Sequence, residues 1–283
     1  MPQLSSSLRV GLFTSLAMLA FAANSLLCRM ALAETSLDPA TFTIIRLLSG
    51  ALMLALICSV KSHFSLRYGS WPGAFALFVY AAGFSFAYTG MNTGTGALLL
   101  FGAVQLTMIA YSLWNNERFN RIQTLGFSLA IIGLVLLLLP SAVSPALLPA
   151  LLMLSAGVAW AVYTLMGRGS KQPLLVTTGN FWRSLPLLII LLWWLPGEGW
   201  PKMSHEAVWY AVASGALASG AGYAIWYAVL PSLQSSVAAT IQLSVPVLAM
   251  LMGWVFLAES ITAQMILACS ATLGGIALVI RHR

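Results

Sequence analysis

Long apolar segments without a charged residue alternate with short polar or proline-containing breaks along the chain. The three longest charge-free segments are residues 72–116, 122–167 and 207–258. A helix needs about 20 apolar residues to cross the hydrocarbon core of a membrane, so each segment is long enough for two spans. Each is also interrupted once, by MNTGTG (91–96), LPSAVSP (139–145) and LPSLQSS (230–236).

This pattern predicts ten transmembrane helices. The runs are continuously apolar rather than alternating, which excludes a β-barrel whose strands cross the membrane. We therefore expect an all-α integral membrane protein. The predicted helices cover residues 10–31, 40–60, 71–91, 95–115, 121–139, 146–167, 174–195, 207–229, 234–257 and 262–281.

Composition supports the same class. Of 283 residues, 60% are hydrophobic and only 7% are charged, whereas soluble domains are about 25% charged. The three cysteines are scattered and have no C-x-x-C spacing, so they predict neither a disulfide nor a metal site. We expect no metal and no cofactor.

The basic residues predict the orientation of the chain. With the N-terminus placed inside, nine basic residues fall on the cytoplasmic side, and only Arg29 and Lys202 fall outside. This asymmetry follows the positive-inside rule and places both termini in the cytoplasm. The net charge of +7 therefore reflects topology, and no nucleic-acid partner is predicted.

Two shifts of the sequence indicate an internal duplication. A shift of 137 residues places Arg46 on Arg183, and a shift of 142 places Glu117 on Glu259. The predicted halves are residues 1–140 and 141–283, with five helices each. Because five is odd, the second half enters the membrane from the opposite side. The prediction is thus one membrane domain built from two inverted five-helix repeats, an architecture of alternating-access transporters.

These features together resemble a known family. Ten helices arranged as five plus five, an arginine in helices 2 and 7, and a glutamate closing helices 4 and 9 are similar to the drug/metabolite transporter superfamily, EamA type. Within it, the chain most resembles the bacterial aromatic amino acid exporter branch. The resemblance implies a carrier in the bacterial inner membrane that exports amino acids or related metabolites.

The two intramembrane arginines allow two interpretations. A charge in lipid is costly, so Arg46 and Arg183 each need a reason to be there. They either bond backbone carbonyls between helices, or they anchor a substrate carboxylate or form a gate. The structural interpretation is favoured, because one substrate rarely needs two identical anchors at opposite depths. Glu117 and Glu259 precede helices, and a role at helix N-termini is favoured for them.

Polar and aromatic residues near the middle of the helices are the predicted substrate contacts. Tyr80, Phe84 and Tyr88 recur every four residues and share a helix face. Pro246 leaves the carbonyl of Gln242 without its helical partner, which predicts a kink. Packing or an interfacial belt is the alternative for the aromatic residues. The predicted substrate-binding residues are Asn24, Tyr80, Phe84, Tyr88, Gln105, Trp160, Tyr163, Tyr223, Trp226 and Gln242.

Absent groups narrow the functional class. No Asp or Glu lies inside a predicted span, so facilitated export is simpler than proton coupling. An intramembrane enzyme is disfavoured, because the sequence has no H-E-x-x-H motif and no buried general base. A multidrug or lipid translocator of the same fold is the alternative function. Helices 5 and 10 carry small residues, which predicts peripheral braces or, alternatively, a homodimer face.

Overall fold

Helices make up every regular element that the computed structural model describes. The described residues are 6–61, 65, 67–115, 120–139, 145–167, 170–195, 203–233, 238 and 241–281. The α-helices are α1 Ser6–Ala33, α2 Pro39–Lys61, α3 Trp71–Tyr88, α4 Thr93–Trp114, α5 Arg121–Leu138, α6 Leu147–Gly167, α7 Pro173–Ser184, α8 His205–Val212, α9 Gly222–Val229, α11 Ser244–Leu257 and α12 Ala263–Arg281.

Local sequence explains where several helices begin. Proline is the first residue of α2 and α7, where its missing N–H would be unpaired in any case. The Ser70 side chain accepts a bond from the backbone N–H of Gly73 and caps α3. Asn120 and Gln123 form a reciprocal capping box at the start of α5.

Helices occupy all ten predicted ranges within the described part of the chain. Seven of them are long and apolar enough to cross a membrane by length and composition. The predicted ranges 71–91 and 207–229 do not meet that criterion, and part of the range 234–257 lies outside the described residues. The prediction of an all-helical membrane protein is therefore confirmed, and seven of the predicted spans satisfy the length and composition criterion within the described residues.

Three predicted helices are less regular than expected. In the predicted range 174–195, α7 is followed by a 3₁₀ helix, Leu185–Trp194. The range 207–229 contains a π-helical segment, Ala213–Ala221, between α8 and α9. In the range 234–257, a turn at Leu243 precedes the start of α11 at Ser244. This interruption lies between Gln242 and Pro246, where the proline predicts a kink, and Pro246 itself lies in the first turn of α11, which tolerates proline.

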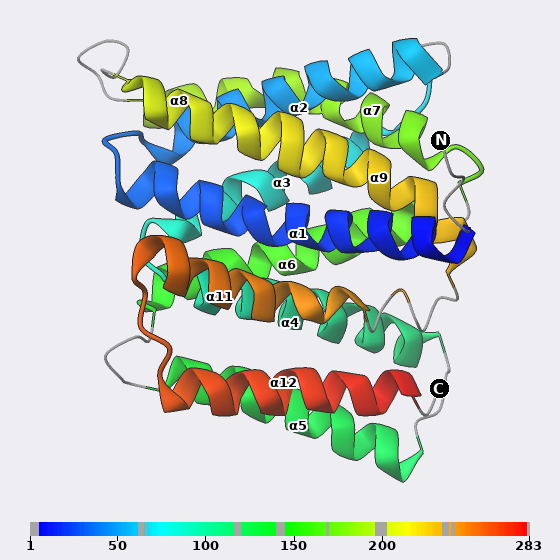
Figure 1. Ribbon diagram of the computed structural model, residues 1–283, viewed down its shortest axis with the longest axis vertical. Helices are drawn as coiled ribbons and strands as arrows, with labels where there is room; N and C mark the ends of the chain where they lie inside the picture. Colours follow the sequence, from blue (N-terminus) through cyan, green and yellow to red (C-terminus); the bar gives the residue numbers. More distant parts are fainter. Residues whose placement is uncertain are drawn as a thin grey trace.

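The helices lie side by side, and the chain begins and ends at the same end of the bundle (Figure 1). We call this the termini end; it also carries the starts of α3, α5 and α7 and the ends of α4 and α6 (Figure 1). The opposite end carries the connections between α1 and α2 and between α3 and α4 (Figure 1).

Helix contacts recur in matching pairs between the two predicted halves. The α3·α6 contact corresponds to α1·α9, and the α4·α6 contact corresponds to α1·α11. The three direct pairs between corresponding helices, α2·α7, α4·α11 and α5·α12, also form. Each half therefore packs mainly against the other half and contributes to one common core.

The α5·α12 pair lies at one edge of the bundle (Figure 1). A Cβ atom added at Gly126 would collide with the carbonyl oxygen of Gly275 at 2.6 Å, and one added at Gly275 would collide with backbone atoms of α5. Gly133 meets Thr272 and Ala268 in the same way. Gly126, Gly133 and Gly275 are thus packed against the other helix of this pair within one chain.

Candidate functional site

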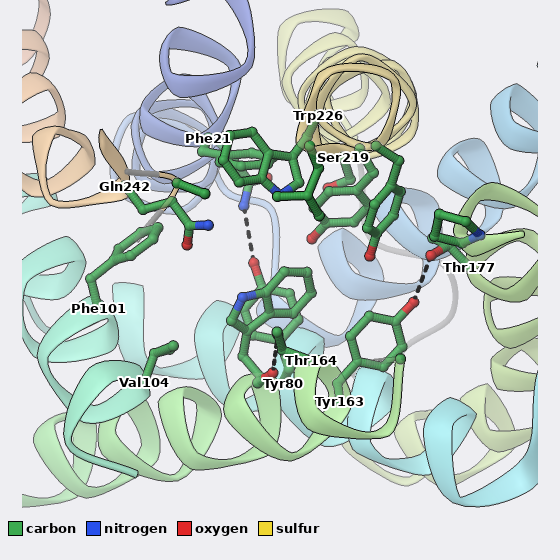
Figure 2. A pocket seen from close by; sticks show the side chains of 18 of the residues that line it. Phe21, Tyr80, Phe101, Val104, Tyr163, Thr164, Thr177, Ser219, Trp226 and Gln242 are labelled. Atoms are coloured by element: carbon green, nitrogen blue, oxygen red, sulfur yellow. Dashed lines mark hydrogen bonds between the residues drawn. The ribbon is translucent and has the colours of Figure 1, made fainter. Parts of the chain in front are cut away.

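A cavity of about 660 Å³ lies among the helices of both halves (Figure 2). Its lining comes from α1, α3, α4, α6, α7, α9, the π-helical segment and the region around Gln242. At the termini end the lining includes exposed residues, Lys171 and Pro231. The cavity therefore communicates with the surface at the end where the chain begins and ends.

The structure brings nine of the ten predicted substrate-binding residues together around this cavity. They are Asn24, Tyr80, Phe84, Gln105, Trp160, Tyr163, Tyr223, Trp226 and Gln242. Tyr88 does not line it: its side chain is fully buried, and its hydroxyl donates to the carbonyl oxygen of Thr93 at 3.1 Å.

Aromatic rings form one continuous part of the cavity wall. The Trp160 ring stacks on Tyr163 and on Tyr223, with centroid separations of 5.2 Å in both cases. It also contacts Tyr80 at 4.7 Å between centroids. Phe21 adds an edge contact to Trp226 from α1. The result is a wall of ring faces, which binds flat apolar groups and, through its π electrons, cations.

Polar side chains also line the cavity, and nearly all of them are neutral. Among the lining residues that the structure describes, Lys171 at the mouth is the charged one, and none is acidic. The Asn24 side chain accepts a bond from Ser214 and lies 3.5 Å from the Tyr80 hydroxyl. The Tyr163 hydroxyl donates to Thr177 (Figure 2). The cavity thus combines apolar faces with neutral hydrogen-bonding groups.

Several lining residues were not predicted from the sequence. They are aromatic or hydroxyl and amide side chains: Phe21, Phe101, Thr177, Asn180 and Ser219. Asn180 offered a signal, because an amide within the apolar segment of helix 7 needs a partner. Phe21 and Phe101 offered none, since a phenylalanine in an apolar helix is equally expected at lipid or in packing.

Arg46 lies beside this cavity and behind Tyr80. Only 2% of its surface is exposed. Its Nη2 donates to the Tyr80 hydroxyl at 3.0 Å, and the guanidinium carbon is 5.1 Å and 4.7 Å from the ring centroids of Tyr80 and Phe84. Its Nη1 has no hydrogen-bond partner among the described residues. Arg46 is therefore a buried cation surrounded by aromatic rings.

Arg183 has different surroundings. Its Nη1 donates to the carbonyl oxygens of Tyr68 and, at 3.3 Å, of Gly179. The neighbouring Asn180 accepts a bond from the Ser70 backbone N–H at 2.8 Å. Gly69, which lies between Tyr68 and Ser70 in the chain, has a φ of 88°, a conformation that favours glycine. Arg183 and Asn180 together hold the turn that leads into α3.

A polar cluster lies at the opposite end of the bundle. Arg29 forms an ion pair with Glu259 at 3.4 Å and donates to the carbonyl oxygen of Tyr88 at 2.9 Å. The Glu259 carboxylate accepts the backbone N–H of Thr93 at 2.8 Å. Glu259 therefore caps the start of α4 and not the start of α12, the next helix in the chain. The side chain of Thr262 caps α12 instead. Three elements are joined: the end of α1, the α3–α4 connection and the segment after α11.

Burial is the largest influence on Glu259 and raises the pKa of its carboxyl above the usual value. The bonds from Thr93 and the charge of Arg29 lower this pKa and offset part of the increase. Gly253 makes the arrangement sterically feasible, because a Cβ there would collide with the Glu259 carboxylate. The corresponding predicted residue of the first half, Glu117, lies outside the described residues.

Comparisons with known proteins agree with this architecture. The model of the EamA-like transporter family matches residues 9–139 and 147–281. An uncharacterized protein of Pseudomonas aeruginosa is 51% identical to this chain, and the match covers 97% of this chain and 96% of that protein. The uncharacterized transporter YoaV of Bacillus subtilis is 26% identical, with 85% of this chain and 86% of that protein covered.

A solved crystal structure also has a similar fold. It aligns over 95% of this chain and 95% of its own chain, with a TM-score of 0.66. At 18% sequence identity, this similarity concerns the arrangement of helices alone. The names of the transporters above state no substrate.

Proposed function

The chain belongs to the EamA-like transporter family, within the drug/metabolite transporter superfamily, and we propose that it exports amino acids, aromatic and other neutral ones, or related metabolites from the cytoplasm. The observation that carries this proposal is the cavity: about 660 Å³ of space, walled by aromatic rings and neutral polar groups. Its size falls within the range of small-molecule sites.

The wall favours a substrate with an apolar side chain and a small polar head. Stacked rings such as Trp160 and Tyr223 bind planar or aliphatic groups, while the Asn24 and Gln242 amides offer both donors and acceptors. A multiply charged anion would need several cationic groups. The described lining provides one, Lys171 at the mouth of the cavity, which does not favour such a substrate. Neutral amino acids and related metabolites match these features best.

The direction of transport is inferred from charge. At the termini end, the described residues include Arg9, Arg67, Arg121, Lys171 and Arg281 and no acidic residue. The opposite end carries Arg29 and all four described acidic residues: Glu34, Asp38, Glu206 and Glu259. By the positive-inside rule, the termini end faces the cytoplasm of a bacterial inner membrane. The cavity would then receive its substrate from the cytoplasm.

Alternating access between two inverted repeats accounts for the asymmetry of the cavity. One end is accessible and the other is closed by the Arg29–Glu259 cluster. The proposal of two repeats, residues 1–140 and 141–283, is supported by the two segments that the family model matches and by the paired helix contacts. The break at Leu243 beside the cavity fits the interrupted helices found at transporter sites.

We propose that transport is facilitative. A proton-coupled carrier needs a group in the transport path that gains and loses a proton, and such groups are usually Asp, Glu or His. None of the described lining residues is of these types. The flux would then follow the gradient of the substrate itself.

Counterflow in proteoliposomes tests the proposed function. Vesicles loaded with unlabelled phenylalanine, tryptophan, threonine or methionine would be diluted into labelled phenylalanine, with and without an imposed pH gradient. We expect accumulation of label that depends on the internal amino acid and ignores the pH gradient. Accumulation that follows the pH gradient would contradict facilitative transport, and no exchange with any amino acid would contradict the substrate class.

A multidrug or lipid translocator is the second candidate function, and one feature favours it. A groove of about 870 Å³ between α1 and the region leading into α11 shares Leu233 with the cavity. An apolar molecule dissolved in the bilayer could enter sideways through such a groove. Uptake of fluorescent apolar dyes or lipids into the same vesicles, without amino acid exchange, would favour this alternative.

A further inference from the structure

Arg46 is a buried cation without a counterion among the described residues. A charge taken out of water is costly unless it is paired and hydrogen-bonded. The described acidic residues lie at the opposite end of the bundle, and Glu259 pairs there with Arg29. Arg46 instead has two aromatic rings, one hydroxyl and a free Nη1. This arrangement leaves part of its positive charge uncompensated beside the cavity.

Tyr80 connects this charge to the cavity. Its hydroxyl oxygen accepts the bond from Arg46 Nη2 at 3.0 Å and lies 3.5 Å from the Asn24 amide nitrogen, which also acts as a donor. Neither contact uses the hydroxyl proton, because the oxygen is the acceptor in both. The dashed line from this hydroxyl runs across the cavity toward the side where Phe21 lies (Figure 2). Tyr80 is thus able to donate a bond to a molecule inside.

A guanidinium bonded to a hydroxyl oxygen strengthens that hydroxyl as a donor. Hydrogen bonds polarise one another along a chain, and the effect increases where water is excluded. The acceptor that gains most from such a donor is an anion, because charge-assisted bonds are roughly twice as strong as neutral ones. A carboxylate fits, since it also supplies the negative charge that Arg46 lacks.

We propose that Tyr80 and Arg46 form a carboxylate subsite in the cavity, an inference that rests on the proposed function and specifies its substrates. One carboxylate oxygen accepts the Tyr80 O–H bond, and Arg46 stabilises the bound anion from behind the ring. The side chain and the ammonium of an amino acid lie against the rings of Trp160 and Tyr223. The cavity then selects substrates with one carboxylate and a neutral or aromatic remainder.

Tyr80→Phe provides the sharpest test, because it removes the hydroxyl and keeps the ring that Arg46 and Trp160 contact. Transport of phenylalanine and of phenylalaninamide, which lacks the carboxylate, would be measured in vesicles. We expect the variant to raise KM for phenylalanine about tenfold or more, since a bond to a charged group is lost. KM for the amide should change by less than about twofold.

Tyr163→Phe is the matched control. Its hydroxyl lies in the same cavity but donates to Thr177, so its loss should affect both substrates alike. Arg46→Lys keeps the charge without the planar guanidinium and should retain part of the preference for phenylalanine over the amide. An equal change of KM for phenylalanine and for the amide in Tyr80→Phe would overturn the proposal of a carboxylate subsite.

A binding measurement separates this inference from the proposed function. Detergent-solubilised protein would be titrated with 3-phenylpropionate and with 3-phenylpropionamide, and quenching of tryptophan fluorescence would report binding. The subsite predicts tighter binding of the acid in the wild type and a loss of that difference in Tyr80→Phe. If no amino acid is transported but this difference is found, the proposed function fails and the subsite stands. Equal binding of acid and amide would overturn the subsite itself.

Discussion

Arg46 and Arg183 coincide when the chain is shifted by 137 residues, and both lie in apolar helices, yet their surroundings differ. Arg183 donates to the backbone carbonyls of Tyr68 and Gly179. Arg46 contacts two aromatic rings and the Tyr80 hydroxyl and keeps one nitrogen unpaired. The same residue type at corresponding positions therefore has two sets of contacts, which depend on the acceptors within reach.

The difference shows that arginines at two matching positions of the proposed repeats can have different roles. Arg183 joins α7 to the turn before α3, where the positive φ of Gly69 brings carbonyls and amides close together. Arg46 contacts the middle of α3, where the α3 side chains that it meets are aromatic. One arginine holds a turn, and the other faces the site where the proposed substrate binds.

The largest expected effect comes from Arg46→Met. Exchange of subsaturating phenylalanine in vesicles should fall by about 10-fold to 100-fold, because the charge behind Tyr80 is lost. Thermal stability in detergent should be unchanged or higher, since an apolar side chain replaces an unpaired buried cation. Unfolding followed by tryptophan fluorescence would check this second point. Normal exchange in the variant would contradict the assignment of Arg46 to substrate binding.

Trp160→Ala should reduce exchange about tenfold, because the ring forms the centre of the cavity wall. Trp193→Ala is the matched control: this tryptophan is 88% exposed and does not line the cavity. Membrane expression of both variants should match that of the wild type. Equal exchange by the two variants would show that the cavity is not the transport site.

Arg183→Met should act on stability rather than on transport. It removes the Arg183 donor from the partly buried Tyr68 carbonyl, which should cost about 1 kcal/mol, the lower end of the range for an unsatisfied acceptor. A lower unfolding temperature, with exchange per folded molecule within about twofold of the wild type, is the expected result. Stability that falls in Arg46→Met and stays constant in Arg183→Met would reverse the roles assigned here.

The smallest effect concerns a third arginine, Arg29, which has an acidic partner. Burial raises the pKa of Glu259 in the closed end, whereas opening that end would expose the carboxyl and return its pKa toward the usual value. The closed end therefore binds a proton more readily, and lowering pH favours closure. Between pH 7 and pH 5 on both sides of the membrane, exchange should slow by about twofold.

Glu259→Gln should remove this pH dependence, because the amide does not titrate in that range. Exchange that accelerates on acidification would contradict the assigned direction. Equal pH on both sides keeps any proton gradient out of the measurement.

The sequence predicted the helices because their signal is local. Charge-free runs and prolines determine where a helix begins and ends, so most predicted boundaries differ from the observed ones by a few residues. The π-helical segment was not predicted. There Gly215 approaches the backbone of Arg46, a contact between residues far apart in the sequence.

The lining of the candidate cavity was predicted in its residue types more than in its arrangement. Large polar and aromatic residues near the middle of a span do line the cavity. Tyr88 does not, because positions every four residues drift around a helix by about 40° per step and rise by about 6 Å. Two steps from Tyr80 therefore move a side chain to another face and beyond the cavity. The Arg29–Glu259 pair could not be predicted, because 230 residues separate its partners in the sequence.

The glycine contact between α5 and α12 bears on how such a chain diverges. Gly126 and Gly275 bring the two backbones together, and neither residue lines the cavity. This helix packing and the proposed substrate site therefore involve separate sets of positions. Mutations around Trp160 or Gln242 can accumulate one at a time while this helix pair stays intact. Proteins with this fold can thus acquire new substrates through a series of variants that each fold.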